Sequence, residues 1–211
     1  MNEQGILIVL SGFSGTGKGT VMNKLLEKYP EEYALSISAT TRRPREGEED
    51  GVSYFFRSRE EFEAMIEKEE LLEYAEYVGN YYGTPRDYVE KQLEAGKNVF
   101  LEIEMLGALK IKNKFPDTLL LFLVPPSIQT LYERLSGRGT ETDQVIHDRI
   151  ARAKEECKVI PEYDYVIVND ELEACVEQVH QTVSTVKCQT ERNNSFIKEL
   201  EKELDVFLKG E

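Results

Sequence analysis

A glycine-rich segment near the N-terminus carries the residues best suited to bind a phosphorylated ligand. Gly12-x-x-x-x-Gly17-Lys18 has the spacing of a phosphate-binding loop, and it follows the short apolar run Ile6–Leu10. Because Gly12, Gly15 and Gly17 lack a Cβ, they can let backbone N–H groups close around a polyphosphate. Lys18 begins a helix whose positive end faces that anion. We therefore predict a nucleotide-phosphate site here.

The loop departs from the usual pattern at one position. Gly19 stands directly after the lysine, and the hydroxyl group comes one residue later, at Thr20. A hydroxyl ligand for Mg²⁺ is therefore a weaker expectation than the phosphate cradle. The alternative is a strand-to-helix turn without a ligand, but strand, loop, lysine and helix follow in the order that phosphate binding requires.

A second candidate phosphate-binding segment lies downstream. Residues 40–45, Thr-Thr-Arg-Arg-Pro-Arg, form the densest positive cluster in a chain whose formal net charge is −14. Pro44 keeps the segment extended, and the planar guanidinium groups of Arg42 and Arg45 suit bidentate binding of a phosphate. A solvated basic loop is the alternative, and the segment alone does not decide between the two.

Two carboxylates follow a buried apolar run. Asn98–Glu104 is expected as a strand, with Glu102 and Glu104 at its C-terminal end, where open α/β sheets carry their ligand sites. Alternate residues of a strand share a face, so both side chains are expected on one side. They could hold Mg²⁺ or its waters, or accept hydrogen bonds from a substrate. A solvated strand end is the alternative.

Arginines surround a glycine hinge in the second half of the chain. Arg134 precedes Gly137 and Arg138, and a later helical segment carries Arg149 and Arg152. Such a group suits a mobile lid that closes over a triphosphate and stabilises transferring charge. A helical hairpin with solvated arginines is the alternative.

The composition indicates an ordinary globular protein of 211 residues. No apolar run approaches the ~18 residues of a membrane-spanning helix. The net charge of −14 argues against nucleic-acid partners and anionic membranes, since both need a basic face. The N-terminus enters the first strand without a secretory signal, so we expect a cytoplasmic protein.

Alternating apolar strands and amphipathic helices predict an α/β fold in three layers, with a parallel sheet covered by helices on both faces. Five segments are expected as its strands: Ile6–Leu10, Ala34–Thr40, Asn98–Glu104, Thr118–Val124 and Tyr165–Asn169. Residues 42–84 interrupt the alternation and are expected to form a lobe inserted over the sheet.

Three segments of this lobe have their own expectations. Val52–Arg57 is expected as a strand, Leu71–Tyr77 as a strand or a helix, and Gly79–Pro85 as a loop. At the end of the chain, residues 191–211 place large apolar side chains on one helical face. We expect this tail helix to pack on its own domain, with a dimer contact as the alternative.

Taken together, these motifs resemble those of guanylate kinases, which transfer the γ-phosphoryl group of ATP to GMP. The resemblance covers residues 5–187 and rests on five segments in the family's order: SGFSGTGK (11–18), SATTRRPR (38–45), GNYYGT (79–84), GRGTET (137–142) and VIVND (166–170). It implies a P-loop domain over residues 1–187, followed by an amphipathic helical extension at 188–211. The domain would comprise a core (1–37, 91–126 and 159–187), a GMP-binding lobe (38–90) and a helical lid (127–158).

The resemblance assigns roles on the acceptor side. It places the GMP phosphate on Arg42, Arg45, Tyr54 and Tyr82, the base on Ser38, Glu73 and Thr84, and the acceptor end beside Glu102 and Glu104. One carboxylate can accept from N1–H and N2–H₂ of guanine together, whereas adenine presents an unprotonated N1 there. Without the family, Glu73 could equally be a surface acid.

The resemblance also assigns the donor side. ATP would be bound by Gly12, Ser14, Gly15, Thr16, Gly17, Lys18, Gly19, Thr20 and Asn169, and the migrating phosphoryl group would be neutralised by Lys18, Arg134, Arg138 and Arg149. Mg²⁺ is expected mainly on phosphates and water, with Thr20 and Glu102 as candidate protein ligands. The implied partners are ATP and GMP or dGMP, without nucleic acid or membrane, for a monomer or homodimer.

Three positions depart from the family pattern. Phe13 replaces a usual Pro, Gly19 stands where many members have Ser, and Leu106 replaces a usual Gln, which removes a polar group beside the acceptor site.

Two rival interpretations remain. Guanylate-kinase-like scaffold domains bind peptides, but they typically lose the glycines and lysine that are intact here as Gly12, Gly17 and Lys18. A kinase of another phosphorylated acceptor, such as a ribose bisphosphate, would not need Glu73 to read a base.

Overall fold

The computed structural model describes residues 4–137 and 142–209, and within them a central sheet of five parallel strands in the order β2-β7-β1-β8-β9. The strands are β1 (Leu7–Gly12), β2 (Tyr33–Leu35), β7 (Asn98–Leu101), β8 (Leu119–Val124) and β9 (Tyr165–Val168). Long crossovers connect parallel strands, and helices fill these connections. The predicted α/β fold with a five-stranded parallel sheet is confirmed.

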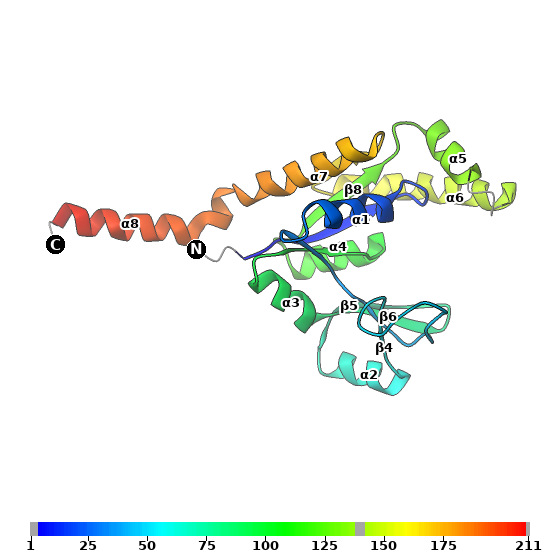
Figure 1. The fold of residues 1–211 in the computed structure, drawn as a ribbon, viewed down its shortest axis with the longest axis horizontal. Coiled ribbons are helices and arrows are strands. Elements are labelled where there is room, and N and C mark those ends of the chain that lie inside the picture. The colour runs from blue at the N-terminus through cyan, green and yellow to red at the C-terminus, as the bar shows by residue number, and fades with distance from the viewer. Residues whose placement is uncertain (1–3, 138–141, 210–211) are drawn as a thin grey trace.

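Helices cover both faces of this sheet (Figure 1). One face packs on α1 (Lys18–Lys28) and α7 (Leu172–Lys187), and the other on α3 (Arg86–Glu94), α4 (Met105–Lys114), α5 (Ile128–Ser136) and α6 (Asp143–Glu156). Successive residues of β1 divide between these cores: Ile8 and Leu10 face α1 and α7, and Val9 faces the opposite side. Burial on both faces explains why the strands are almost wholly apolar.

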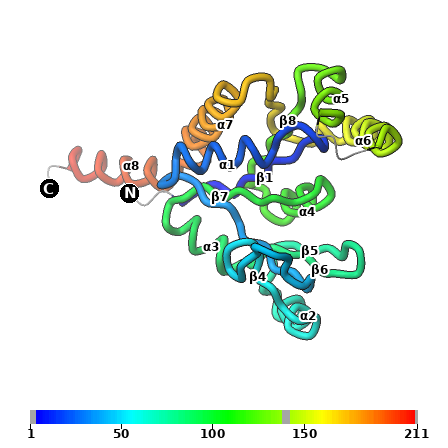
Figure 2. Tube along the Cα trace, turned by 45° about the vertical axis from the view of Figure 1, so that its right-hand side comes forward, coloured from blue at the N-terminus to red at the C-terminus, as the bar shows by residue number. Residues whose placement is uncertain are grey.

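A second, four-stranded sheet forms the inserted lobe, in the order β4-β3-β6-β5. Its elements are β3 (Ala39–Thr40), β4 (Phe55–Phe56), α2 (Arg59–Glu67), β5 (Leu71–Tyr77) and β6 (Asn80–Pro85). A small core of Ala39, Phe62 and Leu71 holds it together. Figure 2 shows this lobe lying to one side of the five-stranded sheet, next to α4.

Four strand predictions need correction. The predicted strand Ala34–Thr40 is two strands, β2 and β3, which belong to different sheets, because the chain crosses into the lobe between them. The predicted loop Gly79–Pro85 is mostly strand β6, since positive φ at Val78 (49°) and Gly79 (73°) makes a tight turn one residue earlier than expected.

The strand predicted over Val52–Arg57 is shorter, because only Phe55 and Phe56 pair as β4. The strand predicted to reach Glu104 ends at Leu101, and Glu104 instead precedes the first turn of α4. Glu102 and Glu104 therefore do not share a strand face.

The tail helix was also wrongly predicted to pack on its own domain. A short 3₁₀ helix (Thr190–Asn193) leads into α8 (Asn194–Lys209), which projects away from the sheet in Figures 1 and 2. No side chain among residues 194–209, all of which the structure describes, is buried. The apolar face of this helix is exposed instead. None of the helices in the described part of the chain is long and apolar enough to cross a membrane.

Candidate functional site

The glycine-rich loop joins β1 to α1 at the C-terminal edge of the sheet. Gly17 is the N-cap of α1 with a φ of 87°, a conformation that L side chains rarely adopt. Gly12 lies so close to β8 that an added Cβ would sit 2.4 Å from the Leu123 carbonyl oxygen. The sequence therefore forms the loop-and-helix geometry that presents backbone amides to an anion.

Side chains brace the loop from within. Asn169, which is buried after β9, donates to the Thr16 carbonyl oxygen at 2.7 Å, and the Thr16 hydroxyl donates to the Phe13 carbonyl oxygen at 2.8 Å. Lys18 Nζ donates to the carbonyl oxygens of Gly12 at 2.5 Å and Phe13 at 3.2 Å. The ammonium group thus lies at the centre of the loop, where a phosphate group could accept from it.

Electrostatics around this lysine join the loop to the acidic residues. Burial lowers the pKa of Lys18, and the negative charges of Glu156, Glu102 and Glu104 oppose that shift. Glu104 and Glu102 are exposed, and Glu104 pairs with Arg152 at 3.3 Å. The two predicted carboxylates therefore lie within electrostatic reach of the loop. They come after the end of β7 and are not part of that strand.

Arginines of α5 and α6 reach the same region. Arg149 on α6 donates to the Ser14 hydroxyl oxygen, and Arg134 on α5 donates to the Asp170 carbonyl oxygen at 3.3 Å. Arg138 lies outside the described residues. Gly19 and Thr20 are exposed in the first turn of α1. Three of the four arginines expected in the lid therefore lie among the described residues, and Arg149 contacts the phosphate loop.

The inserted lobe holds a second cationic group. The Arg42 guanidinium lies 5.3 Å from the Tyr54 ring centre, and the Tyr54 and Tyr82 rings lie edge to face at 6.2 Å. Arg45 is exposed in the same segment. Four residues predicted to grip one phosphate therefore lie on neighbouring parts of this lobe.

Glu48 was not among the predicted site residues. Its carboxylate accepts from both terminal nitrogens of Arg42 at 2.9 Å and from the Arg45 backbone N–H at 2.7 Å. These bonds lower the pKa of Glu48 to about 2 and raise that of Arg42. The sequence feature that could have identified Glu48 is its position in an acidic turn, three residues after Arg45. Arg152, three residues after Arg149 on α6, was expected among the lid arginines but received no individual role, and it pairs with Glu104.

Glu73 and Thr84 form a polar pair on the adjacent strands β5 and β6. The Thr84 hydroxyl donates to Glu73 Oε1 at 2.8 Å, and Thr84 is fully buried. Burial raises the pKa of Glu73, while the hydrogen bond from Thr84 opposes that shift. Glu73 Oε2 approaches Gly107, in the first turn of α4. Ser38 is half-buried between the two sheets. Glu73 is therefore a half-buried acceptor at the junction of lobe and core.

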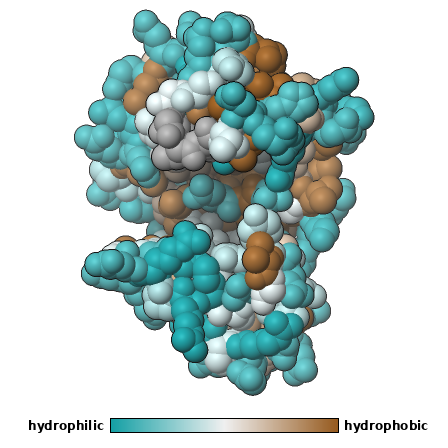
Figure 3. Space-filling model, turned by 90° about the vertical axis from the view of Figure 1, so that its right-hand side faces the viewer, coloured by the Kyte–Doolittle hydropathy of each residue, from teal (hydrophilic) through white to brown (hydrophobic). Residues whose placement is uncertain are grey.

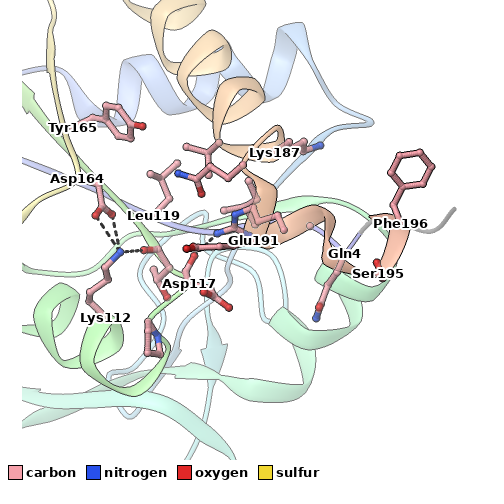
Figure 4. Close-up of a pocket in the computed structure, with 17 residues that line it drawn as sticks. Gln4, Lys112, Asp117, Leu119, Asp164, Tyr165, Lys187, Glu191, Ser195 and Phe196 are labelled. Atoms are coloured by element: carbon pink, nitrogen blue, oxygen red, sulfur yellow. Dashed lines mark hydrogen bonds and ion pairs between the residues drawn. The ribbon is translucent and has the colours of Figure 1, made fainter. Parts of the chain in front are cut away.

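The loop after β1 and the inserted lobe lie toward the same end of the molecule (Figure 1). Figure 3 looks onto this end of the molecule and shows a hollow between the inserted lobe and the body that carries the loop. A separate cavity of about 730 Å³ lies at the opposite edge of the sheet, lined by Lys112, Asp164 and Arg192 among others (Figure 4). It contains none of the predicted site residues. The hollow, not this cavity, is the candidate functional site.

Comparisons with known proteins identify a family. A family model described as guanylate kinase matches residues 4–186. The chain is 55% identical to a guanylate kinase of Halalkalibacterium halodurans over 190 residues, which cover 90% of this chain and 93% of the relative. It is 52% identical to that of Enterococcus faecalis over 202 residues, covering 95% and 99%. The crystal structure of guanylate kinase from Anaplasma phagocytophilum superposes with a TM-score of 0.69 at 33% identity, covering 90% of each chain.

The bracing of the loop by Asn169 can be tested through stability. The variant Asn169→Ala leaves the Thr16 carbonyl oxygen without its buried donor, and we expect the free energy of unfolding to fall by about 1–3 kcal/mol. Urea denaturation measures this change. In the matched control Gln144→Ala, the lost amide is exposed, so we expect a change within about 0.5 kcal/mol. Equal effects of the two variants would contradict the bracing role.

Proposed function

The chain belongs to the guanylate kinase family and phosphorylates GMP to GDP with ATP, and we propose that the reaction takes place in the hollow between the phosphate loop and the inserted lobe. One observation carries this location. A cradle of backbone amides with Lys18 lies on one side, and an arginine–tyrosine cluster centred on Arg42 lies on the other. Two anion sites on facing surfaces suit a donor and an acceptor that meet through their phosphates.

The donor side would hold the triphosphate of ATP. In this proposal the backbone amides of residues 12–20 surround the phosphates, and Lys18 exchanges its loop carbonyl partners for phosphate oxygens. Arg149 already contacts the loop at Ser14, and with Arg134 and Arg138 it would neutralise charge on the migrating group. Asn169 supports the loop and is proposed to lie near the adenine.

The acceptor side would hold GMP by both its ends. Its phosphate would bind Arg42, Arg45, Tyr54 and Tyr82, because guanidinium and phenol groups donate to a dianion. Its base would lie near Ser38, Glu73 and Thr84.

The pairing of Thr84 with Glu73 Oε1 would make this base site prefer guanine over adenine. That bond leaves Oε2 to accept from the N1–H and N2–H₂ of guanine, whereas adenine would bring a lone pair to the same place. None of the acceptor residues is assigned to the ribose 2′-hydroxyl, so we extend the proposal to dGMP.

No general base is required in this mechanism. The GMP phosphate is an anionic nucleophile, so catalysis consists of in-line positioning and electrostatic stabilisation of the transferred group. Glu102 and Glu104 would border the acceptor phosphate. Their negative charges also act on Lys18, whose pKa they raise against the effect of burial.

Nucleotide kinases generally use Mg²⁺ with ATP. Among the described residues, no three His, Cys, Asp or Glu side chains gather as a metal site. This fits Mg²⁺, which commonly keeps its waters and binds through substrate phosphates with one or two protein ligands. We propose that phosphates and water hold the ion, with Thr20 and Glu102 as the candidate protein ligands. The ion would neutralise charge on the donor phosphates.

Replacing Lys18 tests the donor site. We expect Lys18→Ala to lower kcat at least about 100-fold, because the charge that follows the migrating phosphoryl group is lost. Lys24→Ala removes a partly exposed lysine of the same helix that lies outside the loop, and it should leave kcat unchanged. A coupled assay that offers GMP, dGMP, AMP, UMP and ribose bisphosphate with ATP provides the measurement. Near-normal turnover by Lys18→Ala would exclude the proposed role.

Replacing Glu73 tests base recognition. We expect Glu73→Gln to raise the KM for GMP about 10-fold or more and to leave the KM for ATP unchanged. Glu76→Gln, at an exposed position of the same strand, is the matched control. Equal effects on both substrates would contradict base reading.

The raised pKa of Glu73 gives this site a pH dependence. Burial makes its carboxyl take up a proton at higher pH than an ordinary glutamate, so GMP binding should weaken as the pH falls through that pKa. The GMP phosphate itself also takes up a proton as the pH falls, and this affects the wild type and Glu73→Gln equally. Only the wild type should show an additional loss of GMP affinity, and Glu73→Gln should lack it. Identical pH profiles of the KM for GMP would contradict this assignment.

A further inference from the structure

Helix α6 carries two arginines that reach different sides of the proposed site. Arg149 and Arg152 lie three residues apart and are therefore neighbours on the surface of the helix. Arg149 donates to the Ser14 hydroxyl oxygen of the phosphate loop, on the donor side. Arg152 instead donates through Nη2 to Glu104 Oε2 at 3.3 Å, on the acceptor side. The proposed function uses the first arginine and leaves the second without a role.

A second bond holds the Arg152 side chain in this orientation. Its Nε donates to Glu156 Oε1, one turn further along α6, at 3.0 Å. The Glu156 side chain is only 14% exposed, so it supports the guanidinium group from within the protein. Arg152 therefore extends from α6 toward the first turn of α4, which Glu104 precedes. The pair of Arg152 with Glu104 joins the segment expected as a lid to the core of the domain.

The same charges lie close to the phosphate loop. Glu156, Glu104 and Arg152 are all near enough to Lys18 to shift its pKa. The two carboxylates raise this pKa, and Arg152 lowers it. The pair of Arg152 with Glu104 is therefore next to the place where, in the proposed function, the donor and acceptor phosphates meet.

The charge of the acceptor gives this pair a task. GMP brings a phosphate dianion, and the proposed function places that dianion beside Glu102 and Glu104. Like charges a few ångströms apart repel each other, which disfavours binding. An arginine that is paired with Glu104 offsets one of these negative charges and also keeps the carboxylate in place.

Stability does not explain the pair. The side chains of Arg152 and Glu104 are 61% and 75% exposed, and ion pairs at such positions contribute little to the free energy of unfolding. The bond can therefore be lost without loss of the fold. Its value lies in the charge that it places at the edge of the site.

We propose that Arg152 is a positioning residue for the acceptor and that it acts through Glu104. This inference rests on the proposed function. Arg152 holds and neutralises the Glu104 carboxylate, so the GMP phosphate approaches this edge of the site with less repulsion. One helix thus supplies an arginine to each substrate: Arg149 to the donor and Arg152, through Glu104, to the acceptor.

Steady-state kinetics of single and double variants test this role. We expect Arg152→Ala to raise the KM for GMP about fivefold and to change the KM for ATP less than about twofold. Arg152→Lys keeps the charge and should restore part of the affinity for GMP. In a Glu104→Gln background the repelling charge is absent, so the further change Arg152→Ala should alter the KM for GMP less than about twofold.

Three controls separate this role from a structural one. Lys154→Ala removes an exposed cation from the same helix and should leave the KM for GMP unchanged. The ratio of the KM for GMP between Arg152→Ala and the wild type should fall toward one between about 0.05 and 0.5 M salt, because salt screens exposed charges. The urea midpoint of Arg152→Ala should match that of the wild type.

Four results would overturn the proposal. They are an unchanged KM for GMP in Arg152→Ala, an equal rise in the KM for ATP, the same rise in the wild-type and Glu104→Gln backgrounds, and an equal effect of Lys154→Ala. A rise that does not depend on salt, or a lowered urea midpoint, would assign Arg152 to the fold and would overturn it as well. A wild type without turnover of GMP would instead contradict the proposed function.

Discussion

We propose that the attraction between a polyphosphate and the loop after β1 is the interaction around which the site is organised. The chain has a net charge of −14, so an anionic substrate is repelled by most of the surface. Backbone amides, the N-terminal end of α1 and the ammonium of Lys18 create a local exception. Buried strands hold this loop in place, and Asn169 and Thr16 brace it from inside. Local positive potential, rather than overall charge, therefore decides what the protein can bind.

In the proposed mechanism, the inserted lobe binds a second anion. Its arginines would repel one another and attract solvent if they were isolated, but Glu48 and the aromatic rings hold Arg42 in one orientation. Partial burial between the lobe and α4 raises the pKa of Glu73. In our proposal, the acceptor base is recognised where the two sheets meet.

Much of this arrangement could be predicted from the sequence because it depends on local patterns. The apolar strands and the loop glycines need no knowledge of distant residues. The split of residues 34–40 between two sheets was missed, since it depends on which partner each half meets. Glu48 was missed because its significance comes from bonds to two arginines, and the acidic turn around it looked solvated. The tail helix was predicted, but its exposure was not. An amphipathic pattern shows that one face of a helix needs a partner and does not show which surface supplies it.

The central claim is that two phosphorylated ligands occupy separate sites in one hollow. Isothermal titration calorimetry with GMP, before and after saturation with a non-hydrolysable ATP analogue, tests it most directly. The account predicts that each ligand binds with a stoichiometry of one and that the analogue does not displace GMP. Competition between the two, or GMP binding that disappears once the phosphate loop is filled, would contradict it.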